Sequence, residues 1–201
     1  MATSTRNKAM ELWKTALPPG DPEQIARLLF AYDNPPGTKE VAGSQDSIGI
    51  VMPGLNKSNY AGNYWPASIE SVHDEDVLSW LEDRLYLVTL GPRTSDYDVL
   101  SDTKIDASGA RALAAAAEGC WKAVLEKDAV AFGHQLRLSF EAQIAMFPHM
   151  VDEGILNMIE QYRKTALGWK LSGAGGGGYL ILVSEVPIEP AVRVKIRRKE
   201  S

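Results

Sequence analysis

The sequence has one cysteine, Cys120, among its 201 residues, so no disulfide bond can form within the chain. A chain without disulfides fits a reducing compartment, and we expect a cytoplasmic protein. No apolar run approaches the roughly 20 residues that a membrane-spanning helix needs. The first residues are polar, so no signal peptide is predicted. The three histidines lack the spacing of a zinc site, and we expect structural or surface roles for them.

Positive charge is also in short supply. The chain has 21 Lys and Arg against 26 Asp and Glu, a net charge of −5. Nucleic-acid binding favours a basic surface, so this balance argues against it. The basic end at 197–199 leaves two interpretations, a nucleic-acid patch or the charged end of an edge strand. The apolar fraction of 45% and the charged fraction of 23% are typical of a globular protein of one large or two small domains.

Glycine, in contrast, is concentrated in one stretch near the C-terminus. Gly173 and the run 175–178 are followed directly by the apolar residues 179–183, which predict a buried strand. Nucleotide-binding loops of the Walker and dinucleotide types lead from a strand into a helix, and no Gly-Lys-Ser/Thr follows here. Two interpretations stay open from the residues alone: a turn whose backbone N–H groups bind an anion, and a hairpin without a ligand.

The stretch from Lys170 to Val183 resembles the third, glycine-rich motif of the GHMP kinases, and is most similar to the fucokinase and heptose-phosphate kinase branches. The resemblance implies ATP-dependent phosphorylation of a hydroxyl on a sugar or sugar phosphate, with ATP and Mg²⁺ as cofactors. It also implies that the loop holds ATP phosphates through the residues Gly173, Ala174, Gly175, Gly176 and Gly177.

An acidic residue follows Gly43-Ser-Gln, at Asp46. Alone, such an acid is usually a helix cap or a solvated turn residue. The GHMP resemblance implies that Asp46 is the catalytic aspartate, which orients or deprotonates the attacking sugar hydroxyl. Gln45 would then be a neighbour that binds the sugar.

Two further segments match the family in part. Thr3-Ser4-Thr5 resembles the tail of the second motif, so that Thr3 and Ser4 would face phosphate and Ser4 would face Mg²⁺; without the resemblance they are helix caps. Arg93 lies where the family often has Thr-Gly-x-x-Arg, although one residue is inserted here, and it is a candidate contact to substrate or phosphate.

Periodicity predicts a mixed fold. We expect a strand at 85–90, helices across 106–145 with a break at Lys127-Asp128, a helix at 152–162, and strands at 179–183 and 192–196. This order predicts an α+β architecture with helices on one face of an antiparallel sheet. The resemblance refines it to a two-layer ferredoxin-like C-terminal domain at 84–201 and part of an N-terminal domain at 1–83.

The family's first motif and the glycines of its second motif are missing upstream. This leaves two expectations open, activity and inactivity of the chain alone, and three origins for it: a fragment, half of a split enzyme, or the product of a misplaced start. The expected partners are a sugar or sugar phosphate, together with a separately encoded N-terminal half or a second copy in a homodimer. The alternative function is a non-catalytic binding or scaffold domain that kept the fold without the nucleotide site.

Overall fold

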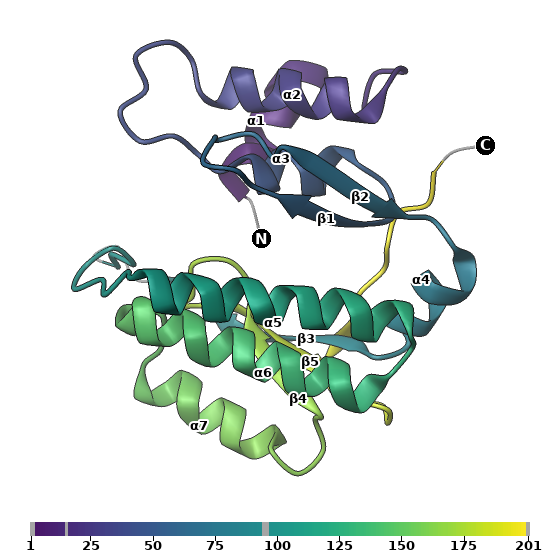
Figure 1. Cartoon of the computed structure of the whole chain (residues 1–201), viewed down its shortest axis with the longest axis vertical. Coiled ribbons are helices and arrows are strands. Elements are labelled where there is room, and N and C mark those ends of the chain that lie inside the picture. Colours follow the sequence, from purple (N-terminus) through teal and green to yellow (C-terminus); the bar gives the residue numbers. More distant parts are fainter. Residues whose placement is uncertain (1–2, 15, 94–96, 200–201) are drawn as a thin grey trace. The chain divides into compact units, whose positions relative to one another are not determined.

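The computed structural model describes residues 3–14, 16–93 and 97–199 (Figure 1). The chain divides into two compact units. One is Ser79–Lys195, and the other is Ala2–Leu78 together with Ile196–Ser201. The predicted division into kinase domains at residue 83 stays a prediction.

The Ala2–Leu78 unit packs three helices with a two-stranded antiparallel sheet in which Leu55 pairs with Val72. Its second helix begins where the sequence signals it: Asp21 accepts a hydrogen bond from the Gln24 backbone, and Pro22 occupies the first turn. The elements in chain order are α1 (Thr3–Trp13), α2 (Pro22–Asp33), α3 (Ser44–Val51), β1 (Leu55–Asn59), β2 (Ser68–Val72) and the start of α4 (Glu75–Glu82).

The core of this unit is small. It is built by buried side chains from α1, α2 and α3, namely Ala9, Ile25, Ala26, Leu29, Ile48 and Val51. Because these side chains fix α3 against α2, they also fix the first turn of α3, which carries Asp46.

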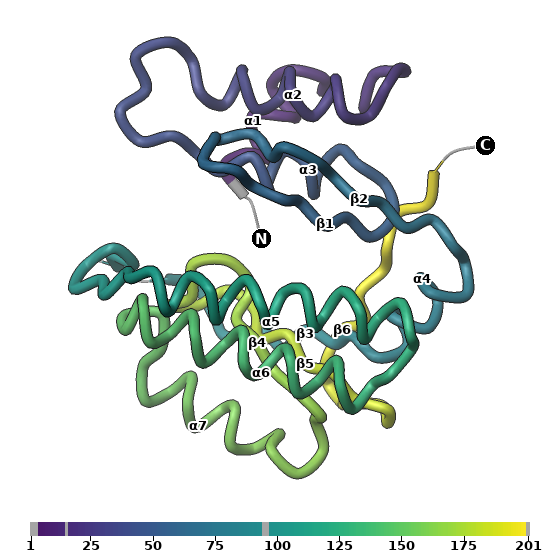
Figure 2. The backbone as a smooth tube through the Cα atoms, in the orientation of Figure 1, coloured from purple at the N-terminus to yellow at the C-terminus, as the bar shows by residue number. Residues whose placement is uncertain are grey.

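The Ser79–Lys195 unit is a four-stranded antiparallel sheet in the order β4-β5-β3-β6, with helices packed against it (Figure 2). Three of its helices begin at an aspartate whose carboxylate accepts from the backbone N–H three residues on: Asp106, Asp128 and Asp152. The elements are β3 (Leu85–Gly91), α5 (Ala107–Leu125), α6 (Ala129–Met146), a 3₁₀ turn η1 (Pro148–Met150), α7 (Glu153–Tyr162), β4 (Gly168–Leu171), β5 (Gly178–Val183) and β6 (Val192–Arg193).

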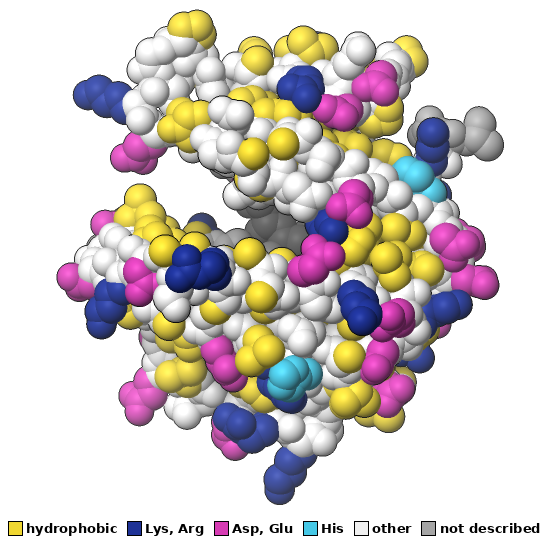
Figure 3. All heavy atoms as spheres, in the orientation of Figure 1, with side chains coloured by type: hydrophobic (Ala, Val, Ile, Leu, Met, Phe, Trp, Pro, Cys, Tyr) yellow, Lys and Arg dark blue, Asp and Glu magenta, His cyan; other side chains and the backbone are white. Residues whose placement is uncertain are grey.

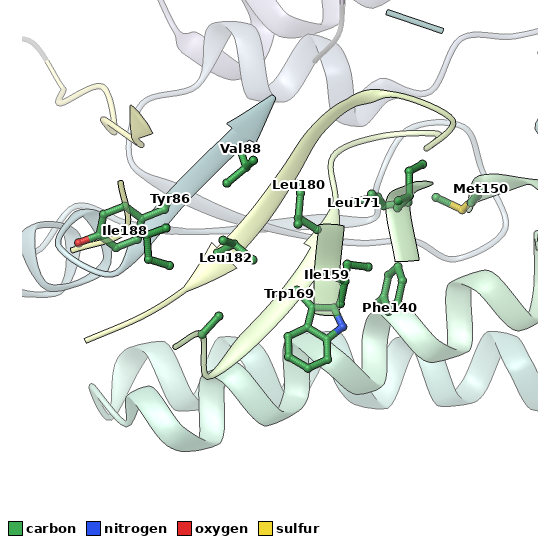
Figure 4. Close-up of a cluster of buried hydrophobic side chains, with 12 residues drawn as sticks. Tyr86, Val88, Phe140, Met150, Ile159, Trp169, Leu171, Leu180, Leu182 and Ile188 are labelled. Atoms are coloured by element: carbon green, nitrogen blue, oxygen red, sulfur yellow. The ribbon is translucent and has the colours of Figure 1, made fainter. Parts of the chain in front are cut away.

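Alternate residues of the strands supply the core of this unit, as the period of two requires. Figure 4 shows Phe140 and Trp169 between the strands and the helices. The buried strand residues are Tyr86, Val88, Trp169, Leu171, Leu180 and Leu182, and they meet Phe140, Met150, Ile155 and Ile159. The core therefore holds the chain on both sides of the glycine-rich turn, at Leu171 and Leu180.

The predicted α+β architecture is confirmed, and so is the helix break, where Lys127 takes a positive φ of 56° and Asp128 caps α6. The strand predicted at 192–196 is wrong in length, because only Val192–Arg193 is strand. From Ile196 the chain belongs to the other unit, where the backbone N–H of Gly54 donates to the carbonyl of Arg197 at 2.8 Å. The N–H of Val194 still donates to the carbonyl of Leu85 at 3.0 Å. β3 begins at Leu85, so it offers no partner to the residues beyond Val194, although their sequence alternates.

Acidic and basic side chains alternate over the face drawn in Figure 3, without a single-sign patch on the Ser79–Lys195 unit. Within the described ranges, no helix combines the length and the apolar character needed to cross a membrane.

Candidate functional site

The turn between β4 and β5, the yellow-green connection in Figure 2, has left-handed backbone at each of its glycines. Its φ angles are 73° at Gly173, 73° at Gly175, 64° at Gly176, 144° at Gly177 and 83° at Gly178. Side-chain-bearing residues rarely adopt these angles, which explains why this turn is almost all glycine. We call residues Ser172–Gly178 the glycine loop.

Close packing adds a second reason for glycine. A Cβ atom at Gly175 would lie 2.5 Å from the carbonyl oxygen of Met150, and one at Gly176 would lie 2.1 Å from the Tyr97 ring. The Gly176 N–H donates to the Met150 carbonyl at 2.9 Å. Since Met150 is buried in the core, this bond ties the loop to the body of the unit.

Three consecutive backbone amides of the glycine loop are available to a ligand. In the part of the chain that the structure describes, the N–H groups of Gly173, Ala174 and Gly175 have no hydrogen-bond acceptor. The sign of φ alternates across these residues, because only the two glycines are positive. Successive amides in such a conformation form a concave anion-binding nest. The anion-binding interpretation of the sequence therefore has the donors it needs.

Two side chains hold the carbonyl oxygens of the same loop. The Tyr97 hydroxyl donates to the Ala174 carbonyl at 2.6 Å, and Arg93 Nε donates to the Gly175 carbonyl at 2.8 Å. The Arg93 guanidinium also lies 5.6 Å from the centre of the Tyr97 ring. A hollow of about 450 Å³ borders Gly176 and is lined by Tyr97, Pro148, His149, Val151 and Asp152.

Asp46 lies in the first turn of α3 and is half-buried. Burial is the largest influence on it and raises the pKa of its carboxyl group above 3.8, and the nearby negative charge of Asp33 acts in the same direction. A carboxyl group with a raised pKa is a better proton acceptor than one in water. Gln45 is exposed and folds over Gly43, where a Cβ would meet its amide at 2.5 Å.

The start of α1 differs from the expectation of a cap. The helix begins at Thr3, so Ser4 is in the first turn, with an exposed side chain; the side chain of Thr3 lies outside the described residues. The hydroxyl in this segment that makes a contact is Thr5, which is buried and donates to the Asp33 carboxylate at 2.6 Å. Sequence reasoning missed Thr5 and Asp33, because 28 positions separate them.

Lys170 precedes the glycine loop on β4, between the core residues Trp169 and Leu171. Its amine donates to Gln143 of α6. Burial lowers the pKa of this amine to about 8, partly offset by Cys120 of α5. Burial also raises the pKa of the Cys120 thiol to about 11, which makes it a poor nucleophile.

The buried amine gives a prediction for stability against pH. The folded pKa of Lys170 is about 8 and the ordinary value is 10.5, so between these the unfolded chain binds more protons. The free energy of unfolding should therefore rise with pH through this window, by about 1–3 kcal/mol. In Lys170→Met this contribution should vanish, as measured by urea unfolding at several pH values.

The matched control for that measurement is Lys164→Met, which removes an exposed lysine of the same unit. Its curve should run parallel to wild type. Parallel curves for wild type and Lys170→Met would show that the burial of Lys170 carries no pH dependence.

No family model and no curated protein matches the sequence. Solved structures do match. A candidate sugar kinase from Campylobacter jejuni has 18% identity and a TM-score of 0.59, and the match covers 92% of this chain and 52% of that one. The fold is GHMP-kinase-like. A D-glycero-D-manno-heptose 1-phosphate kinase from Bacteroides thetaiotaomicron has 16% identity and a TM-score of 0.54, with 89% of this chain and 49% of that one covered.

A mevalonate kinase also matches, at 16% identity and a TM-score of 0.51, with 88% of this chain and 53% of that one covered. The chain thus spans about half the length of the kinases it resembles. Among the predicted site residues, the structure groups the glycine loop with Arg93 in one unit, and Gln45 and Asp46 with Ser4 in the other. Their roles stay predictions.

Proposed function

We propose that this chain supplies the phosphate-holding loop and the hydroxyl-orienting carboxylate of an ATP-dependent kinase for a sugar or sugar phosphate. One observation carries the proposal: the nest of free amides at Gly173, Ala174 and Gly175 lies on a fold shared with sugar and heptose-phosphate kinases. Phosphoryl transfer suits such a site, because catalysis of this reaction is largely positioning and charge stabilisation.

Within the glycine loop, the stretch Gly173 to Gly177 would bind phosphate oxygens of ATP through its free amides. Backbone amides are fixed donors, so they need little rearrangement as negative charge develops. Arg93, already bonded to the loop through Nε, would offer its terminal nitrogens to a phosphate or substrate oxygen.

Asp46 would accept the proton of the attacking hydroxyl or orient it. Its position in the first turn of α3 gives it a fixed direction, and burial brings its pKa closer to neutrality. Gln45 would hydrogen-bond a sugar hydroxyl beside it.

Mg²⁺, when bound, neutralises charge on the transferred phosphate. Hard cations take oxygen ligands, and Ser4 with Asp33 supplies a hydroxyl and a carboxylate in the same unit. Thr5 would position Asp33 through its 2.6 Å hydrogen bond, while Thr3 would face phosphate. We place this reaction in the cytoplasm, where ATP is available. The reducing conditions there suit a chain that has one cysteine and therefore no internal disulfide bond.

The match covers only about half of each kinase, and this affects the activity that we propose for the chain. The kinases that match are about twice as long, so the rest of the ATP pocket would come from a separately encoded N-terminal half or from a second copy of this chain. The same observation favours one alternative, a binding or scaffold domain without phosphoryl transfer.

The test is ADP release by the purified protein with MgATP and a panel of sugars and sugar phosphates. The kinase proposal predicts release that depends on one sugar class. The scaffold alternative predicts the same background ADP release with every sugar and no binding of MgATP to the protein.

A further inference from the structure

We propose that Tyr97 and Arg93 are positioning residues that set the direction in which the glycine loop presents its amides. This inference rests on the proposed phosphate-holding role of the loop. It identifies Tyr97, a residue without any motif in the sequence, as part of the phosphate site.

The argument starts from the geometry of a trans peptide, in which the C=O and N–H bonds point in opposite directions. Tyr97 Oη holds the Ala174 carbonyl at 2.6 Å. The N–H on the other side of that same peptide belongs to Gly175, and it therefore points away from Tyr97. This is one of the free amides of the nest.

The next peptide is fixed at both ends. Arg93 Nε holds the Gly175 carbonyl at 2.8 Å, and the Gly176 N–H on the opposite side donates to Met150 at 2.9 Å. Gly176 thus serves as an anchor to the core, and the three consecutive amides that precede it are left for a ligand.

These hydrogen bonds, which act as clamps on the two carbonyls, are needed because a peptide group next to glycine flips easily. Without Cβ atoms, Gly175 and Gly176 populate positive and negative φ about equally, and a flipped peptide would present a carbonyl oxygen where the amide was. A carbonyl repels an anion. Holding the two carbonyls on the far side keeps the nest in its binding form before a ligand arrives.

The surroundings of Tyr97 support this role. Its ring lies against the open side of Gly176, where a Cβ would come within 2.1 Å. Burial raises the pKa of its hydroxyl, so Tyr97 stays a proton donor through the neutral range. The Arg93 guanidinium, 5.6 Å from the ring centre, holds the two side chains together.

The experiment follows the loop amides by NMR while inorganic tripolyphosphate is added to wild type, Tyr97→Phe and Arg93→Lys. Phe keeps the ring and removes one hydroxyl; Lys keeps the charge and removes Nε. In wild type the Gly175 amide should shift on titration. In both variants the dissociation constant should rise by about three- to tenfold, the loss expected for one hydrogen bond. Tyr64→Phe, at an exposed tyrosine of the other unit, should match wild type.

The outcomes separate this inference from the proposed function. If wild type shifts and both variants bind equally well, the clamp is overturned while the phosphate site stands. If the amides of Gly173 to Gly175 do not respond in wild type, the donor assignment fails, and the loop is removed from the proposed function as well. If Tyr97→Phe does not fold, Arg93→Lys still tests the proposal.

Discussion

Replacing Asp46 by asparagine should lower sugar-dependent ADP release by about a hundred- to ten-thousandfold, the usual contribution of a general base. The amide keeps the size of the side chain but cannot accept the proton of the hydroxyl. Substrate binding should change far less, so the loss should appear in kcat and not in KM.

The fold should survive this replacement and gain slightly in stability. Burial raises the folded pKa of Asp46 above 3.8, so the ionised carboxylate costs stability above the folded pKa, and this cost disappears as pH falls through it. A neutral asparagine avoids the cost, so the thermal midpoint at neutral pH should rise, by an amount that solvent screening at this half-buried site keeps small.

Asp76→Asn is the control, since it removes an exposed carboxylate at the start of α4. It should leave turnover unchanged. The assignment of Asp46 would be contradicted by full turnover in Asp46→Asn, measured in whichever assembly the wild-type protein is active.

The second large effect is on stability. Gly168→Ala should lower the free energy of unfolding by about 3 kcal/mol or more, because the new methyl group has no space. A Cβ at Gly168 would lie 2.2 Å from the carbonyl oxygen of Gly133 and 2.6 Å from its Cα. Both are backbone atoms, so only a shift of α6 away from β4 could relieve the clash.

The reciprocal change, Gly133→Ala, meets the backbone of Leu167 at 2.6 Å and should also destabilise. The sign of this change in the free energy of unfolding is informative, because alanine normally stabilises a helix by about 1 kcal/mol over glycine. Gly49→Ala in α3, where a Cβ has nothing within 4 Å, should show that ordinary gain. Urea unfolding measures all three. Equal gains at Gly133 and Gly49 would exclude the close approach of α6 and β4.

Contacts such as these could not be predicted from the sequence, whereas elements that depend on local signals could. Amphipathic periods predicted α5, α6 and α7, and apolar or alternating runs predicted β3, β5 and the start of β6, because both signals are local. The density of glycine predicted a turn between two strands, and the positive φ angles of its glycines explain that density. The strand at 192–196 was overextended because a strand needs a partner that alternation does not supply.

The hydrogen bonds of the candidate site join residues that are far apart in the sequence. Tyr97 and Ala174 are 77 positions apart, Arg93 and Gly175 are 82 apart, and no local pattern connects them. Thr5 and Asp33 likewise meet only once α1 and α2 are folded. A motif search finds the loop; only the folded chain shows which of its amides are free.

The most direct test of the account is thermal unfolding of this chain with and without MgATP, beside Mg²⁺ alone. A ligand at a hundredfold excess over its Kd stabilises the folded state by about 2.7 kcal/mol, which is about 5–10 °C for a chain of this size. The account predicts such a rise in wild type and a smaller one in Tyr97→Phe. An unchanged midpoint in a cooperative transition would contradict it, since the chain would then fold without a nucleotide site.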